Sequence, residues 1–267
     1  MIQPILEAWE RARSQLERVP RRWALAPTIG IGMAIALNTG LMWDAIWYER
    51  GGDYGFFIAQ AERFLDGAGF YEPHQLAGPF VFTIGVDNVY PPPALLLFLA
   101  FALLPGPLWW AIPLAAIGGA VLAWRPSPWA WPVIAVLCWM PRTQAIVIWG
   151  NTTLWITAFV ALGLWFAWPS VLVLIKPYFA PLALIGIRHR AWWVAAAVFV
   201  AINLVLLPVW ADYLTAWRNA GSSWPSLSYS PADVFILSIP IVAWLARAPA
   251  APLDAQRDMT PTVMHSN

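Results

Sequence analysis

Apolar residues gather in long runs along the chain instead of alternating with polar ones. The first run covers residues 24–43, long enough for a membrane-crossing helix, which needs about 20 apolar residues. Further runs cover residues 91–104, 108–124, 130–140, 143–168, 171–187, 191–210 and 232–246. Several of these are shorter than a full span, and prolines cut between or within them. The pattern predicts seven or eight hydrophobic helical segments, some of them broken or re-entrant.

Composition favours a membrane as the solvent for these segments. Of the 267 residues, 60% are hydrophobic and only 11% are charged, against roughly 45–50% and about 25% in a soluble domain. A single core could not bury so much apolar surface, so we expect an all-α, polytopic membrane helix bundle. The net charge of +1 does not suggest nucleic-acid binding, and Cys138, the one cysteine, excludes an intrachain disulfide.

Charge divides the chain into regions. Residues 1–23 carry arginines and an apolar helical face, which predicts a cytoplasmic interfacial amphipathic helix, with an ordinary solvated leader as the alternative. Residues 24–247 are expected to form one transmembrane domain, followed by a disordered tail over 248–267. With a cytoplasmic N-terminus, the loop over 44–89 is extracytoplasmic, and it is rich in carboxylates. We therefore expect an integral protein of a bacterial plasma membrane.

The extracytoplasmic loop holds the first candidate for chemistry, Asp53. The glycines at 51–52 predict a turn, a helix is expected to begin near Asp53, and the glycines at 67 and 69 end it. The apolar face of this helix, predicted to lie against the membrane, consists of Phe57, Ala61, Phe64 and Leu65. An acidic residue in a first helical turn is also stabilised by the helix N-terminus, so helix capping is the simpler role for Asp53. Asp44 and Glu49 are the other carboxylates of this loop that could act as a general base in place of Asp53. His74 is either a solvated loop histidine or a contact for an acceptor substrate.

Three further elements follow along the chain. Tyr90 precedes three prolines, which is typical of an interfacial tyrosine and a rigid entry turn. Asn151 follows Gly150 at the start of a long apolar segment and is expected to cap a helix there. The run over 171–187 has two prolines near its centre, Pro177 and Pro181, which predicts two short half-helices with Lys176 at the break.

A lysine at membrane depth costs roughly 2.5–3.5 kcal/mol on insertion scales and is a functional candidate by default. For Lys176 the alternatives are snorkelling to an interface or pairing with a carboxylate. The functional interpretation is a partner for an anionic lipid phosphate.

Together these elements resemble the polyprenol-phosphate-mannose-dependent mannosyltransferases of glycosyltransferase family 87, which have the C-type, multi-span glycosyltransferase fold. The residues that carry the resemblance are Asp53 and Tyr54, Ala59 to Ala61, Gly67 to Tyr71, Tyr90 to Pro92, Gly150 to Thr153, and Lys176 with Pro177. The family's Gly-Gln-x-Asn motif lacks its glutamine in this chain, which has Asn151 at that position.

The resemblance implies transfer of a sugar, mannose in the family, from a polyprenyl-phosphate donor to an acceptor hydroxyl on a glycan or glycolipid. Asp53 would be the general base, Lys176 and Arg142 would bind the donor phosphate, and Tyr90, Asn151 and His74 are further site candidates. No metal or other cofactor is implied. The chain is shorter than the family pattern, so an inactive relative or a protein partner that supplies further spans is an open alternative, as is a non-catalytic binding or transport protein.

Overall fold

The computed structural model describes residues 10, 14, 51–224 and 231–247, and the regular structure of these residues is helical. The all-α class predicted from the sequence is therefore confirmed for this part of the chain. The expected helix over 1–23, the first span over 24–43 and the tail over 248–267 lie outside the described residues, apart from Glu10 and Ser14.

The first helices are α3 (Gly52–Leu65), α4 (Pro73–Ala77), α5 (Pro93–Ala102), α6 (Leu108–Trp124), α7 (Ala130–Trp139), α8 (Pro141–Trp149) and α9 (Thr153–Phe166). A series of 3₁₀ turns and one short helix follows, namely η1 (Trp168–Ile175), η2 (Pro177–Phe179), α10 (Ala180–Ala183) and η3 (Leu184–Gly186). The chain continues as α11 (Arg190–Val205), α12 (Leu207–Ala220), η4 (Gly221–Ser223), η5 (Pro231–Asp233) and α13 (Val234–Leu245).

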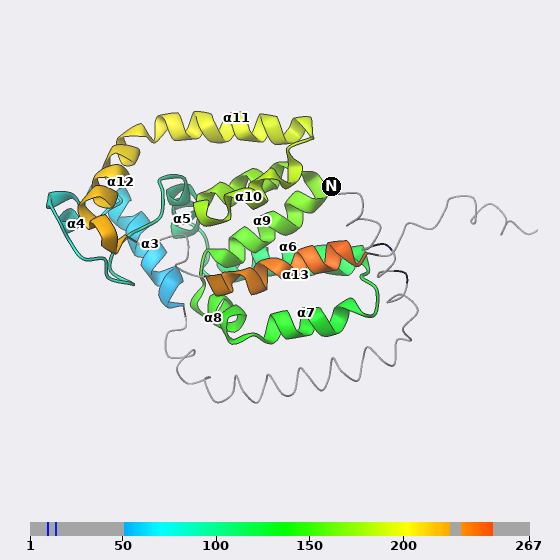
Figure 1. The fold of residues 1–267 in the computed structure, drawn as a ribbon. Coiled ribbons are helices and arrows are strands. Elements are labelled where there is room, and N and C mark those ends of the chain that lie inside the picture. Colours follow the sequence, from blue (N-terminus) through cyan, green and yellow to red (C-terminus); the bar gives the residue numbers. More distant parts are fainter. Residues whose placement is uncertain (1–9, 11–13, 15–50, 225–230, 248–267) are drawn as a thin grey trace, which may run out of the picture.

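Helix α9 lies at the centre of the bundle, in contact with α6, α13 and η1 (Figure 1). Its residues from Thr153 to Ala161 are all buried. A helix that is apolar on every side is stable only where neighbours surround it, so its sequence already favours this interior position. Gly163 lets η1 pack closely, because a Cβ atom there would come within 2.8 Å of the Ser170 Cβ.

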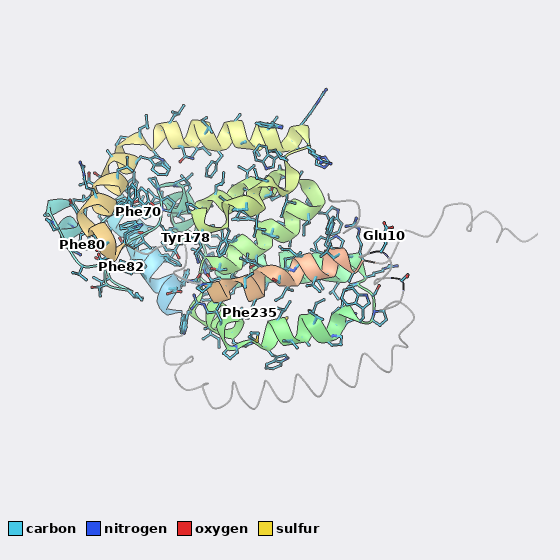
Figure 2. All side chains as sticks on the ribbon, in the orientation of Figure 1. Glu10, Phe70, Phe80, Phe82, Tyr178 and Phe235 are labelled. Carbon is cyan, nitrogen blue, oxygen red and sulfur yellow. The ribbon has the colours of Figure 1, made fainter. Side chains whose placement is uncertain are left out.

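Three helices, α3, α4 and α12, gather at one end of the bundle, where Figure 2 also places Phe80 and Phe82. The Asn219 side chain on α12 donates to the Gln75 carbonyl on α4 at 2.9 Å. On α3, Phe57 and Ala61 are buried, and the helix packs against α5. The sequence predicted that this apolar face lies against the membrane. For Phe57 and Ala61 that is corrected, because they pack in the protein's own core, whereas Leu65 at the helix end is 57% exposed.

The helices are short and often broken. None of the described helices is by itself long and apolar enough to cross a membrane. Two consecutive pairs reach that length and composition together: α7 with α8, bent by 59°, and α11 with the helix formed by α12 and η4, bent by 77°. The run over 143–168 divides at Gly150, and the run over 171–187 breaks at Lys176 as predicted. Neither half is one regular α-helix, because the first is a 3₁₀ helix and the second consists of η2, α10 and η3. Membrane crossing stays a prediction.

Candidate active site

A cavity of about 340 Å³ lies where the start of α3, the end of α8 and the break at Lys176 meet. Of the sequence candidates, five line this cavity: Asp53, Tyr90, Arg142, Asn151 and Lys176. Its apolar lining includes Phe56, Phe57, Phe82 and Ile84. The cavity therefore combines charged groups with aromatic and aliphatic surface. Asp53 and Lys176, to which the resemblance assigns the base and the phosphate partner, both line it.

Two glycine turns place the acid and the amide of the site. Gly51 adopts a left-handed conformation with φ 67° at the N-cap of α3, and its N–H donates to the Ile148 carbonyl at 2.8 Å. Gly150 ends α8 with φ 73°, and its carbonyl accepts from the Trp109 indole at 2.8 Å. The start of α3 is thus tied to the end of α8, and Asp53 faces the residue that follows Gly150. Gly51, not Asp53, occupies the N-cap position.

Replacing Gly150 with alanine is expected to destabilise the fold by about 2–4 kcal/mol. A Cβ atom at this position would approach the Trp110 ring to 2.8 Å and the Tyr54 Cβ to 2.9 Å, in a backbone conformation that alanine disfavours. Thermal unfolding in detergent measures the effect. Gly118→Ala is the control, because nothing lies within 4 Å of its added methyl group. Equal melting temperatures for the two variants would contradict this account of Gly150.

The Asn151 side chain bridges the acid and the lysine. Its Nδ2 donates to Asp53 Oδ2 at 2.6 Å. Its Oδ1 accepts from the Thr153 N–H at 2.9 Å, the Thr153 hydroxyl at 2.8 Å and Lys176 Nζ at 3.3 Å. Asn151 was predicted to cap α9, but the N-cap residue is Thr152, and Asn151 lies one residue before it. Its side chain still accepts from the Thr153 N–H at the start of the helix. The contacts with Thr153 and with Asp53 use opposite ends of one carboxamide, so the same side chain makes both.

Lys176 belongs to a buried charge cluster centred on Asp233. The lysine is 4% exposed, and its Nζ lies 3.0 Å from Asp233 Oδ2 and 2.5 Å from the Thr153 hydroxyl. Arg142 Nε donates to the other carboxylate oxygen, Oδ1 of Asp233, at 2.8 Å. Of the alternatives for Lys176, the structure therefore shows pairing with a carboxylate.

Asp233 and Thr153 also belong to this site, although neither was predicted from the sequence. Asp233 is a lone carboxylate at the start of the apolar run over 232–246, and that position was the available signal. Thr153 lies within the Gly150 motif, but its hydroxyl was not singled out. Lys176 is also the only lysine in the sequence.

Tyr90 forms part of the cavity wall and is held from two sides. Its hydroxyl lies 2.9 Å from the Thr152 hydroxyl, and its carbonyl accepts from the Tyr71 hydroxyl at 2.7 Å. Burial raises the pKa of the Tyr71 phenol well above its ordinary value, so this group stays protonated and remains a donor. The turn before α5 is thereby fixed against the loop that carries Tyr71.

His74 does not line the cavity. It lies on α4, and its Nε2 is 2.6 Å from Asp87 Oδ1, while Asp87 itself lines the cavity and is 4% exposed. The histidine is thus connected to the cavity only through Asp87 in these contacts, and its contact with an acceptor stays a prediction. Asp44 and Glu49, the competing carboxylates, lie outside the described residues.

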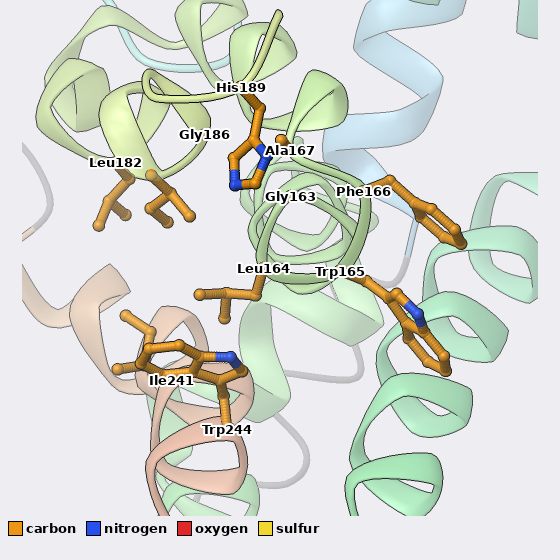
Figure 3. A pocket seen from close by; sticks show the side chains of 11 residues that line it. Gly163, Leu164, Trp165, Phe166, Ala167, Leu182, Gly186, His189, Ile241 and Trp244 are labelled. Carbon is orange, nitrogen blue, oxygen red and sulfur yellow. The ribbon is translucent and has the colours of Figure 1, made fainter. Parts of the chain in front are cut away.

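A second cavity, of about 510 Å³, lies at the opposite end of α9 and is shown in Figure 3. His189 is its only titratable lining residue, and the remainder is apolar or glycine, including Leu164, Ile241 and Trp244. It is the larger of these two cavities, but no carboxylate, lysine or arginine lines it.

The chemical capacity of the smaller cavity follows from its charges. Asp53 can accept a proton, and Arg142 and Lys176 can stabilise an anion. Within the described ranges, no group of three or more His, Cys, Asp or Glu residues is arranged to hold a metal ion. Comparison of the chain with models of protein families, with curated proteins and with solved structures gave no match.

Proposed function

We propose that this chain is an integral membrane glycosyltransferase that moves a sugar from a polyprenyl-phosphate donor to an acceptor hydroxyl on the extracytoplasmic side. The supporting observation is that Asp53, Lys176 and Arg142 line one cavity, with Asn151 bonded to both the acid and the lysine. The resemblance adds mannose as the sugar and a glycan or glycolipid as the acceptor.

The reaction is a single displacement. The acceptor oxygen forms a bond to the anomeric carbon of the sugar, and the bond from that carbon to the phosphate oxygen breaks. The acceptor proton moves to Asp53, and polyprenyl phosphate leaves with the bonding electrons. Because an aspartate in water has a pKa of about 4, it is a weak base, so it accepts the proton late in the step. A direct displacement inverts the configuration at the sugar carbon.

The two cations have different tasks in this proposal. Lys176 Nζ already donates to Asn151, Thr153 and Asp233, so it contributes mainly through its charge. The Arg142 side chain is 26% exposed, and it binds Asp233 through Nε. Arg142 is therefore the residue we assign to direct contact with the donor phosphate.

Replacing Arg142 with glutamine is expected to weaken donor binding about tenfold, because a charge-assisted bond to phosphate is lost. The measurement is a titration of the purified protein in nanodiscs with a short-chain polyprenyl phosphoryl mannose. Arg125→Gln is the matched control, since Arg125 is exposed and ends α6, away from the cavity lining. If both variants bind the donor as the unaltered protein does, Arg142 does not contact the phosphate.

The function itself is tested by incubating the nanodisc protein with a donor labelled in its sugar and a panel of hydroxyl acceptors. Appearance of labelled, inverted product supports the proposal, and donor binding without any product from the panel or from water argues against it.

Transport is the second candidate function, and one observation favours it. The buried carboxylate of Asp233 beside Lys176 is the kind of intramembrane pair that proton-coupled transporters use. A transporter would move a labelled substrate across a sealed vesicle without changing it chemically, which distinguishes it from the enzyme.

A further inference from the structure

An apolar loop over residues 79–86 lies between α4 and α5. None of its residues is charged. Three of its aliphatic side chains are largely exposed: Val81 at 80%, Ile84 at 72% and Val86 at 51%. A single exposed aliphatic residue is normal on any protein surface, whereas several together mark an interaction surface. The loop is also part of the segment 44–89, which the sequence analysis expects outside the membrane, so lipid-facing helices do not account for this exposure.

The backbone of the loop is fixed to the end of α12. The Phe80 N–H donates to the Asn219 carbonyl at 3.2 Å, and the Phe82 N–H donates to the Ser223 hydroxyl at 3.0 Å. Figure 2 shows Phe80 and Phe82 at this end of the bundle. Backbone donors that bond within the protein need no water, which is the condition for placing a loop in apolar surroundings. The protein therefore holds the exposed side chains in a defined place.

The same loop forms part of the candidate active site. Phe82, Ile84 and Gly85 line the smaller cavity. The Thr83 N–H donates to Asp87 Oδ2 at 2.6 Å, and Asp87 lines that cavity too. Ile84 both lines the cavity and is largely exposed, so the loop is a wall with one side toward the cavity and the other toward the outside.

The chemistry of the loop favours a bilayer as its partner. A stable protein interface takes roughly 20–30 residues from each side, and this loop has far fewer. A loop without charge gives an ionic partner nothing to pair with, whereas the acyl chains of a lipid require only apolar surface. Trp217 on α12 is 52% exposed, two residues before the Asn219 that holds the loop. Tryptophan is enriched where a membrane meets water.

We infer that residues 79–86 insert into the outer face of the lipid bilayer, with Val81 and Ile84 among the headgroups and the first acyl carbons. One wall of the cavity thereby lies at the membrane surface. This inference rests on the membrane setting of the proposed function and not on its chemistry.

The test measures the depth of a spin label by electron paramagnetic resonance. Cys138, the one cysteine, is first replaced by serine, and a cysteine is then introduced as Val81→Cys or Ile84→Cys and labelled. In nanodiscs, accessibility to oxygen, which concentrates in the bilayer, is compared with accessibility to a water-soluble nickel chelate. The labels should lie about 5–10 Å into the boundary between headgroups and acyl chains.

Two matched positions calibrate the measurement. Asp66→Cys is the aqueous control, because Asp66 is an exposed carboxylate at the end of α3. Val198→Cys is the membrane reference, because Val198 is 54% exposed on α11, which belongs to one of the two bent pairs that could cross a membrane. Relative to Asp66→Cys, the loop labels should show a higher ratio of oxygen to nickel accessibility, shifted toward that of Val198→Cys.

The outcomes separate this inference from the proposed function. Nickel accessibility at the loop equal to that of Asp66→Cys, with Val198→Cys in lipid, overturns only the inference. A loop label that neither reagent reaches indicates contact with protein, such as a second copy of the chain, and also overturns it. Should Ile84→Cys fail to fold, Val81→Cys decides, because Val81 does not line the cavity. A water-accessible Val198→Cys removes the membrane setting and both proposals, whereas absence of sugar transfer leaves the depth result standing.

Discussion

Replacing Asp53 with asparagine is expected to lower the rate of sugar transfer by about 10²–10⁴-fold, the usual contribution of a general base. The asparagine retains an oxygen that can accept from Asn151 Nδ2, which lies 2.6 Å from Asp53 Oδ2, so the geometry of the cavity should persist. Donor affinity should be unchanged or slightly stronger, because a negative charge near the donor phosphate is removed. Loss of rate with retained binding identifies an interaction made only in the transition state.

The measurement is single-turnover transfer from labelled donor, together with a separate donor titration. Asp66→Asn is the matched control, since Asp66 is an exposed aspartate at the other end of α3. Its rate should equal that of the unaltered protein. A fully active Asp53→Asn variant would show that the base assignment is wrong. An equal loss of transfer rate in both variants would indicate that α3 is disturbed, and it would not support Asp53 as the base.

Replacing Lys176 with methionine is expected to destabilise the protein by about 3 kcal/mol and to abolish transfer. Methionine fills a similar volume but removes the ion pair between Lys176 and Asp233, while the pair of Asp233 with Arg142 persists. Removing one member of a buried ion pair costs about 3–5 kcal/mol, because the other charge stays buried and less well compensated. We expect the lower end of this range because the Arg142 pair persists.

Thermal unfolding in detergent measures the change, and a double-variant cycle assigns it. Adding Asp233→Asn to Lys176→Met removes the uncompensated carboxylate, so the double variant should be more stable than Lys176→Met alone. Additive losses would mean that the two side chains do not interact. Recovery of stability in the double variant without recovery of transfer would separate the structural role of Lys176 from its role toward the phosphate.

Much of the local structure could be predicted from the sequence. The helix that begins near Asp53 and ends before Gly67 is present, with the left-handed Gly51 at its start. The break at Lys176, which is followed by Pro177, is also present, and Asn151 contacts the start of α9. These features depend on nearby residues, because proline and glycine restrict or free the backbone locally and a cap acts within one turn.

The partners within the site could not be predicted in the same way. Asp53 and Asn151 are separated by 98 residues, and Arg142 and Asp233 by 91. Hydrophobic periodicity indicates which residues avoid water but not which helices become neighbours. For the same reason the sequence did not indicate that Phe57 and Ala61 would pack inside the protein and not against lipid.

The sequence by itself determined the apolar segments, their breaks and the positions of the charged residues that interrupt them, since each is set by side-chain polarity and local backbone preference. Only the tertiary structure decided that Asp53 and Lys176 share a cavity, that Asn151 joins them, and that Asp233 holds both cations. The physical reason is the cost of a buried charge. Charged side chains on distant segments can be buried only where helix packing brings opposite charges into contact. Which of them come into contact depends on the packing of the whole bundle.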